Sequence, residues 1–454
     1  MYGPPPDPRQ VLVPVDPSTH PGAFAVCFVA AAGLWALAAL RRQPEALRAW
    51  WFVLGWVVAL TAPLAGVLTR YVYGSFPTID KAGSLLFYLE GVHYTVTLHP
   101  VAAIHDPAAR LIGVHVGHLW ITALFDLLLE PFAAFNAQGI LYPALGWWGA
   151  ALFARSLRGR WDVALLVGFP FGMGLHVFRD LNWYTIEKAA VGFLALFAWG
   201  VFRAWRDGGR WRFIAAGLYV GMAFVNWYLA LVGAAGTAMA LGVAWVGTSW
   251  RDPRLRNLLI ACLACSVAVM PLVAMQLALL SGPGTLGDPE RFLTERAIPD
   301  SFTLVPPMWN RLELTRALNG PVLALAALGV VWGGGTARAL AAVAAGLFTL
   351  ALGPQVLPEV PNPVYMALHA AIPGFWRVAK PEVFFEGTWL CLIGVAALGL
   401  PDRWLRRSAL WGVPVFAAGW LLIVRTHPVF PPFAEPVPVE LAPDWQQRVG
   451  MQPP

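Results

Sequence analysis

Residues 111–132 read LIGVHVGHLWITALFDLLLEPF, and the way this stretch meets a membrane decides the fold. The stretch is long and apolar enough to cross a bilayer, which takes about 20 residues. Its pattern also fits a helix that lies flat in the membrane interface. Apolar side chains recur at helical spacing on one side: Ile112, Val116, Leu119, Ala123 and Leu127. Polar side chains form a stripe on another side: His115, His118, Thr122 and Asp126.

Composition places the chain among multi-pass membrane proteins. Of its 454 residues, 58% are hydrophobic and 12% are charged, and the mean hydropathy is +0.61. Soluble domains carry about 25% charged residues. The net charge of +6 is read as loop charge that sets orientation in the membrane, and no nucleic-acid partner is expected.

Twelve apolar segments are candidates for transmembrane helices. They cover residues 22–40, 50–69, 136–154, 161–178, 186–203, 212–230, 232–249, 257–280, 319–333, 336–353, 383–400 and 408–425. The fold class predicted from them is all-α, a polytopic protein of about twelve transmembrane helices. The N-terminus lacks the basic region of a signal peptide, so we expect the first segment to be retained.

The distribution of basic residues orients these segments. With the N-terminus outside and strict alternation, the inside turns carry 17 Lys and Arg residues against five acids. The outside receives 14 basic and 20 acidic residues. This agrees with the positive-inside rule. If residues 111–132 crossed the membrane, every later basic turn would face outward, so the rule favours the flat-lying helix.

The predicted domain plan follows from this orientation. Residues 1–21 form an outer N-terminal segment, 22–425 the transmembrane domain, and 426–454 a Pro-rich outer tail that either packs on the loops or stays mobile. The first outer loop, residues 70–135, holds two amphipathic interface helices, 82–98 and 111–132. In the first of these, Glu90 and His93 lie on the polar face.

Polar residues that could carry chemistry concentrate at the outer side. Asp80, in YGSFPTIDKAGS, could bind a divalent cation or take a proton from a hydroxyl, or it could simply cap the helix that follows. The loop's five histidines could form a metal site or face water and phosphate at the interface; they are His93, His99, His105, His115 and His118.

Two further polar groups lie near the predicted outer helix ends. One holds Arg179, Asp180, Asn182, Glu187 and Lys188, which either line a polar cavity or pair with each other. The second holds Arg377 and Lys380 in IPGFWRVAKPE. These two cations beside aromatic residues either bind a lipid-linked phosphate or extend toward lipid headgroups.

The order of these features resembles the GT-C superfamily of multi-pass glycosyltransferases, over roughly residues 45–425. An outer loop with an acid, YGSFPTID, follows an early span, and interface helices come next. FAAFNAQGILYPALGWWGAALFARSLRGR is similar to the family's aromatic-Asn helix and small-Arg turn. RDLNWYTIEKAAVGFLALF resembles its polar cluster before a short span. IPGFWRVAKPEVFFEGTWL resembles its late Pro-Gly-Phe loop with a basic residue.

The resemblance implies transfer of a sugar from a polyprenyl-phosphate carrier to an acceptor on the outer face. By position, Asp80 matches the family's first-loop acid, as general base or as ligand of a divalent cation (Mg²⁺ or Mn²⁺). Arg377 and Lys380 match the late basic residue that contacts the donor phosphate. The remaining substrate-binding residues expected are Arg179, Asn182, Glu187, Glu90 and His93.

Other functions stay open at this point. A non-catalytic scaffold of the same ancestry would bind membrane lipids and other membrane subunits. Three departures from the family pattern favour it: Lys81 follows Asp80, Glu382-Val383 stands where the family usually has a second arginine after proline, and an extra N-terminal span covers residues 22–40. A transporter would carry charges near mid-membrane on several helices. We expect a bacterial inner-membrane protein with both termini on the outer, periplasmic side.

Overall fold

The computed structural model describes the apolar segments and several of the turns between them. The described residues are 21–65, 71–72, 116–129, 131–174, 177, 189–247, 249, 251–280, 307–357, 360–371, 375, 381–400, 409–426 and 437–438. These residues are mostly helical, with only four strands of two or three residues among them. Each of the twelve predicted segments overlaps a helix among the described residues, which confirms a mostly helical protein; segment 212–230 runs past the end of one helix (Trp211–Val225) into the next (Trp227–Gly247).

The chain divides into two compact units, described separately below. Unit 1 comprises residues 1–148, 175–192 and 414–454, and unit 2 comprises residues 149–174 and 193–413. Three helices contribute residues to both units: α8 (Pro131–Arg158), α12 (Val191–Asp207) and α22 (Gly412–Thr426).

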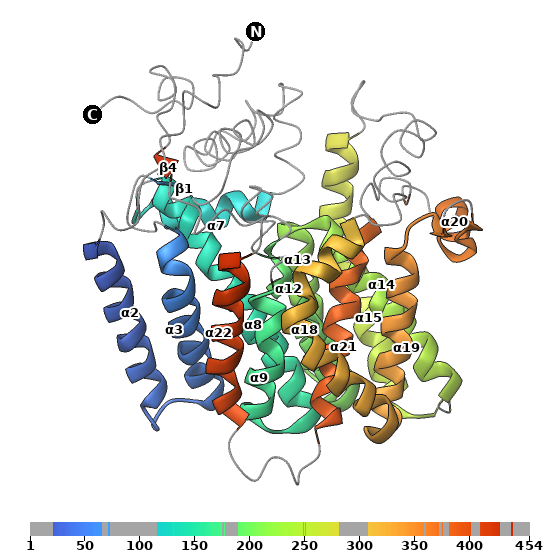
Figure 1. The fold of residues 1–454 in the computed structure, drawn as a ribbon. Coiled ribbons are helices and arrows are strands. Elements are labelled where there is room, and N and C mark those ends of the chain that lie inside the picture. The colour runs from blue at the N-terminus through green and yellow to red at the C-terminus, as the bar shows by residue number, and fades with distance from the viewer. Residues whose placement is uncertain are drawn as a thin grey trace. The chain divides into compact units, whose positions relative to one another are not determined.

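Unit 1 is built on an antiparallel pair of helices, α2 (Pro21–Ala39) and α3 (Glu45–Ala65), which run side by side (Figure 1). Gly55 allows the close approach, because a Cβ atom there would lie 2.6 Å from the Trp35 indole. Aromatic contacts then join this pair to α8. The rings of Trp50 and Trp148 lie 5.3 Å apart, and the Trp148 indole N–H donates to the Ala46 carbonyl at 3.1 Å.

The decisive stretch 111–132 does not form one membrane-length helix in the part that the structure describes. It contains α7 (Val116–Asp126), a turn, and then the start of α8 at Pro131. Eleven residues of α-helix span about 16 Å, roughly half of the hydrocarbon core of a bilayer. Leu124, Leu127 and Leu128 are exposed, whereas Thr122, expected on the polar stripe, is buried. Protein rather than water therefore covers that side of α7.

A short strand pair connects the segment after α3 to the C-terminal tail. Strand β1 (Tyr71–Val72) pairs antiparallel with β4 (Val437–Pro438). This confirms, of the two alternatives for the tail, that part of it packs on a loop.

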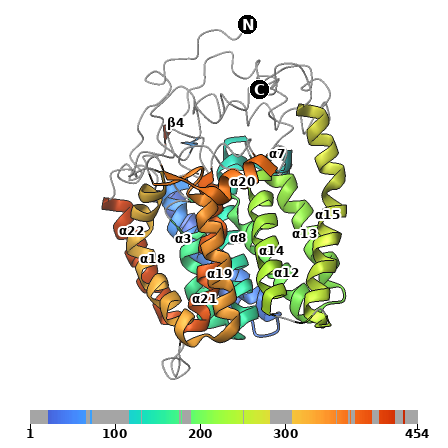
Figure 2. The ribbon, with the colours of Figure 1, turned by 90° about the vertical axis from the view of Figure 1, so that its right-hand side faces the viewer.

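Unit 2 surrounds one almost completely buried helix, α21 (Phe384–Gly399). Its neighbours within the unit are α18 (Pro307–Trp332), α19 (Gly334–Ala351), α14 (Trp227–Gly247) and α9 (Trp161–Gly172). Helix α13 (Trp211–Val225) packs between α14 and α15 (Pro253–Leu280), as Figure 2 shows. The 3-10 turns η5 (Pro381–Val383) and η7 (Ala409–Trp411), the strands β2 (Gln355–Leu357) and β3 (Val360–Pro361), and helix α20 (Pro363–Ala371) complete it.

The helices of both units expose large apolar side chains. In unit 2, Leu263, Val267 and Met270 on α15 are 58–65% exposed, and Val246 at the end of α14 is 89% exposed. Contiguous apolar faces of this kind are costly in water and are expected where lipid covers them.

Three described helices are long and apolar enough to cross a membrane: Trp227–Val246, Pro253–Ala274 and Gly334–Ala351. This is consistent with a membrane protein, but the structure does not confirm twelve spans. Several other apolar helices, such as Trp161–Gly172 and Phe384–Gly399, are only 10–17 residues long. The apolar runs in the sequence predict where these helices lie. They do not predict where the helices end, because the ends depend on turn and cap residues that hydropathy does not detect.

Candidate functional site

The residues predicted to bind and transform substrate all lie outside the described residues. They are Asp80, Glu90, His93, Arg179, Asn182, Glu187, Arg377 and Lys380. The structure therefore does not test whether they come together. It does describe the framework on either side of the segment that carries Arg377 and Lys380.

An aromatic stack in unit 2 holds the chain just before that segment. The Phe375 ring lies 5.2 Å from the Tyr365 ring of α20 and 6.4 Å from the Phe384 ring of α21, almost parallel to the latter. All three side chains are buried. After the segment, η5 begins at Pro381, and a Cβ atom on Gly353 would lie 2.9 Å from the Pro381 ring. The five residues 376–380 thus join two well-packed positions.

Asn362 ties the end of α19 to the start of α20. Its side-chain Nδ2 donates to the carbonyl oxygens of Thr349 at 2.7 Å and Gly353 at 2.8 Å. Its Oδ1 accepts from the Tyr365 backbone N–H at 3.3 Å, which is the N-cap interaction of α20. The sequence Asn362-Pro363 suits this position, because proline is favoured as the first residue of a helix. One fully buried side chain therefore satisfies the orphan groups of two helix ends.

Replacing Asn362 by alanine should destabilise unit 2 by about 2–4 kcal/mol, since three buried hydrogen bonds are lost and their partners stay desolvated. Unfolding in mixed detergent micelles measures the change. Asn362→Asp keeps the acceptor for Tyr365 but loses both donors, so it should not restore stability. Wild-type stability in the aspartate variant would show that the two donated hydrogen bonds contribute little.

Glu386 is the acidic residue that the sequence interpretation missed. It lies in the first turn of α21 and is only 4% exposed. The next residue, Gly387, faces α14 and α19, because a Cβ atom there would lie 2.7 Å from Val232 and 2.9 Å from Leu347. Thr388 then donates to the Phe384 carbonyl of its own helix at 3.2 Å. The Glu386 side chain is therefore buried in the first turn of α21, six residues after Lys380.

A signal for Glu386 was present in the sequence. It is the only acid within the apolar run 383–400, and acids inside such runs usually face the protein interior and serve a function. A carboxyl group near the end of a buried helix can balance a nearby cation or accept a proton. The resemblance drew attention to Arg377 and Lys380 instead, which lie earlier in the same stretch.

The described residues hold no group of three or more His, Cys, Asp and Glu side chains that could bind a metal ion. The predicted ligand Asp80 and four of the five loop histidines lie outside that part of the chain. The fifth, His118, lies in α7, but nothing is described of its side chain. A divalent cation at Asp80 stays a prediction.

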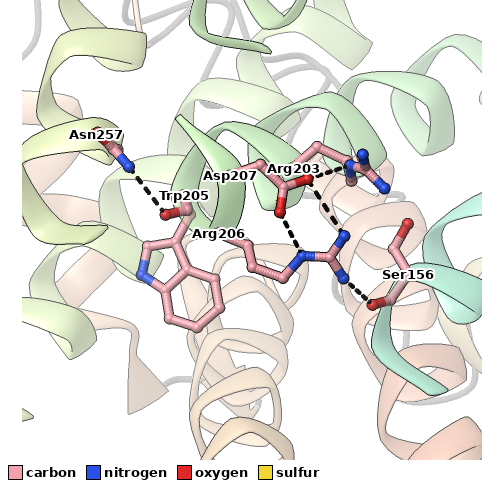
Figure 3. Close-up of polar contacts among 6 residues, drawn as sticks. All are labelled: Ser156, Arg203, Trp205, Arg206, Asp207 and Asn257. Atoms are coloured by element: carbon pink, nitrogen blue, oxygen red, sulfur yellow. Dashed lines mark hydrogen bonds and ion pairs between the residues drawn. The ribbon is translucent and has the colours of Figure 1, made fainter. Parts of the chain in front are cut away.

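A second polar cluster, also in unit 2, surrounds Asp207 where α12 ends (Figure 3). The Asp207 carboxylate pairs with Arg203 at 2.6 Å and with Arg206 at 2.7 Å. Arg206 also donates to the Ser156 carbonyl at 2.8 Å, which joins α12 to the end of α8. Gly208 follows with φ +64°, a left-handed conformation that ends the helix. The Asp207 carboxylate thus forms ion pairs with two arginines next to a tight turn.

The hydrogen bond from Arg206, helped by the charge of Arg203, lowers the pKa of Asp207 below its usual value of 3.8. Its contribution to stability is therefore present above pH 3.8 and is lost as the pH falls through the folded-state pKa. We expect wild type to exceed Asp207→Asn in stability by a constant amount at neutral pH, and this difference to shrink in acid. Unfolding midpoints of both proteins against pH measure it; a difference that grows in acid would contradict the assignment.

Comparison with known proteins gives no further identification: no protein-family model matches the chain, and no curated protein matches it.

Proposed function

We propose that the protein is a glycosyltransferase of the GT-C type that uses a polyprenyl-phosphate sugar at the outer face of a bacterial inner membrane. The proposed chemistry is the one that the resemblance of the sequence to the GT-C superfamily implies. The exposed apolar faces of the helices and the three span-length helices support the membrane setting. Helix α7, too short to cross alone, is compatible with the orientation that puts Asp80 outside.

The observation that carries the proposal is the framework around residues 376–380. Phe375 and Pro381 are held by buried packing, and Glu386 is buried one turn further on. Membrane proteins seldom bury an acid within an apolar helix without a function. By connectivity, Arg377 and Lys380 stay within a few residues of this framework, at the α21 end that the orientation assigns to the outer leaflet.

The proposed reaction uses each residue in one role. Asp80 takes the proton from the acceptor hydroxyl, whose oxygen attacks the anomeric carbon of the donor sugar. The bond between that carbon and the phosphate oxygen breaks, and the polyprenyl phosphate leaves with the electron pair. Arg377 and Lys380 stabilise the developing phosphate charge. In the alternative role, Asp80 would hold a divalent cation, Mg²⁺ or Mn²⁺, which would supply further positive charge to the site.

The remaining expected residues would position the substrates. Arg179, Asn182 and Glu187 would line the cavity, and Glu90 and His93 would face it from the first interface helix. The lipid chain of the donor would lie between helices. Other membrane subunits could present the acceptor.

The test is a donor assay on the purified protein in lipid nanodiscs. A panel of polyprenyl-phosphate sugars is offered, and release of free polyprenyl phosphate is measured with nucleotide sugars as the control donors. The proposal expects release with at least one polyprenyl-linked sugar and none with nucleotide sugars. If no polyprenyl-linked sugar binds or reacts, and Mg²⁺ and Mn²⁺ do not bind, the non-catalytic scaffold is the better description.

A further inference from the structure

Three turns of unit 2 carry a large surplus of positive charge that the proposed reaction does not use. They lie between α8 and α9, between α12 and α13, and between α14 and α15. Together they hold three aspartates and ten arginines, called here the arginine surface: Arg155, Arg158, Arg160, Arg203, Arg206, Arg210, Arg212, Arg251, Arg254 and Arg256.

Side-chain contacts join the three turns into one surface. Arg206 donates to the Ser156 carbonyl, connecting the first turn to the second (Figure 3). Arg212 donates to the Asn257 Oδ1 atom at 2.5 Å, and the Asn257 amide donates to the Trp205 carbonyl at 3.5 Å. These two bonds connect the second turn to the third.

Four of these arginines stack on aromatic rings. Arg155 lies 4.8 Å from the centre of the Trp161 ring and Arg203 4.5 Å from that of Trp211. Arg254 lies 5.4 Å from the Trp205 ring, and Arg206 lies 5.8 Å from the Phe202 ring. Arg203 and Arg206 already pair with Asp207, whereas Arg254 is exposed and the ring beside it restricts its guanidinium without occupying its N–H groups. That geometry suits bidentate binding of phosphate oxygens.

The aspartates compensate only part of this charge. Asp207 forms ion pairs with Arg203 and Arg206, and Asp162 forms an ion pair with Arg160 at 2.7 Å. Asp252 accepts from the Arg254 backbone N–H at 2.7 Å, as the N-cap of α15. Four arginines beyond these three are exposed, so much of the positive charge is available at the surface: Arg210, Arg251, Arg254 and Arg256.

Exposed apolar side chains lie in the same turns and at the adjoining helix ends. Phe213, one residue after Arg212, is 71% exposed, and Trp245 and Val246 at the end of α14 are 50% and 89% exposed. Arginines directly beside apolar side chains are typical of the depth at which lipid headgroups meet acyl chains. This distinguishes the arginine surface from a site for a soluble anion, which would lack the apolar border.

We propose that the arginine surface binds the phosphate groups of anionic phospholipids. Binding would hold unit 2 at a defined depth in the membrane and connect its three turns through shared headgroups. The proposal rests on the described contacts of unit 2 and does not depend on glycosyl transfer.

The test uses the full chain in detergent, titrated with phosphatidylglycerol, phosphatidylcholine or glycerol phosphate. The variant Arg210→Gln, Arg251→Gln, Arg254→Gln removes three exposed charges from the surface. The matched control, Arg41→Gln, Arg42→Gln, Arg338→Gln, removes the same charge from the turn after α2 and from the first part of α19. Each arginine near a headgroup is worth about fivefold in association. The variant should therefore bind phosphatidylglycerol roughly a hundredfold more weakly, and the control far less so.

Several results would overturn the proposal. Equal affinity for phosphatidylcholine would show that the negative charge of the lipid does not drive binding. Undiminished binding of phosphatidylglycerol by the variant would show that the arginine surface is not the binding site. Competition by glycerol phosphate at the same concentration as the lipid would show a soluble-phosphate site instead. If the variant does not fold, the wild-type salt dependence decides: added salt should weaken binding of phosphatidylglycerol, and unchanged binding would contradict the proposal.

Discussion

Replacing Asp80 by asparagine is expected to lower the rate of sugar transfer by at least about a hundredfold, because a general base contributes that much or more. The amount of folded protein should not change. Asparagine removes the proton acceptor but is as good a helix cap as aspartate. The substitution therefore separates the two interpretations of Asp80. If Asp80 is the base, transfer is lost; if it only caps the helix, asparagine keeps the cap and transfer is unchanged.

The matched control for Asp80→Asn is Asp106→Asn, a neutralisation in the same outer loop. It should leave the rate of transfer near that of wild type. The measurement is release of polyprenyl phosphate at saturating donor, with folded protein quantified by size-exclusion chromatography. Full activity of Asp80→Asn would show that the base assignment is wrong, and equal loss in both variants would point to a general effect of loop charge.

The largest effect on stability is expected from Gly329→Ala, where α18 crosses α21. A Cβ atom at Gly329 would overlap the Val395 carbonyl oxygen and lie 2.8 Å from the Val395 side chain. Gly399 on α21 faces the backbone of α18 equally closely, because a Cβ atom there would overlap backbone atoms of Leu325 and Gly329. Because the opposing atoms belong to backbone, they cannot move aside by changing rotamer. The helices would have to separate, at a cost of about 3 kcal/mol or more.

Gly221 provides the matched control for Gly329. It also lies inside a helix, α13, but a Cβ atom there would meet nothing within 4 Å. Alanine should be neutral or stabilise the protein by up to about 1 kcal/mol, because glycine is a poor helix former. Unfolding in mixed micelles gives both values. If Gly329→Ala is as stable as Gly221→Ala, the two helices do not pack as closely as described.

The positions of the helices could be predicted because apolar runs and their basic flanks are strong signals. The interior of unit 2 could not be predicted in the same way. Asn362 connects residues 9 and 13 positions away through donors that only the folded backbone brings into reach. Tyr365, Phe375 and Phe384 form a stack across a loop that the sequence shows only as Pro-rich.

The candidate site was predicted less completely, for physical reasons. Glu386 was passed over because a single acid scarcely alters the hydropathy of an apolar run. Thr122 belongs to the predicted polar stripe yet is buried, because helical spacing shows which residues share a face but not what covers it. The pairing of Tyr71–Val72 with Val437–Pro438 joins segments far apart in the chain and leaves no local pattern.

The orientation of unit 2 in the membrane is the claim on which the proposed chemistry depends. Cysteine labelling of intact cells tests it most directly, in a background without the native Cys27, Cys262, Cys265 and Cys391. With the outer membrane made permeable, an impermeant maleimide should label His105→Cys, and should label Arg254→Cys only after the inner membrane is opened. Labelling of Arg254→Cys in cells with a closed inner membrane would mean that residues 111–132 cross the bilayer, and would contradict the account.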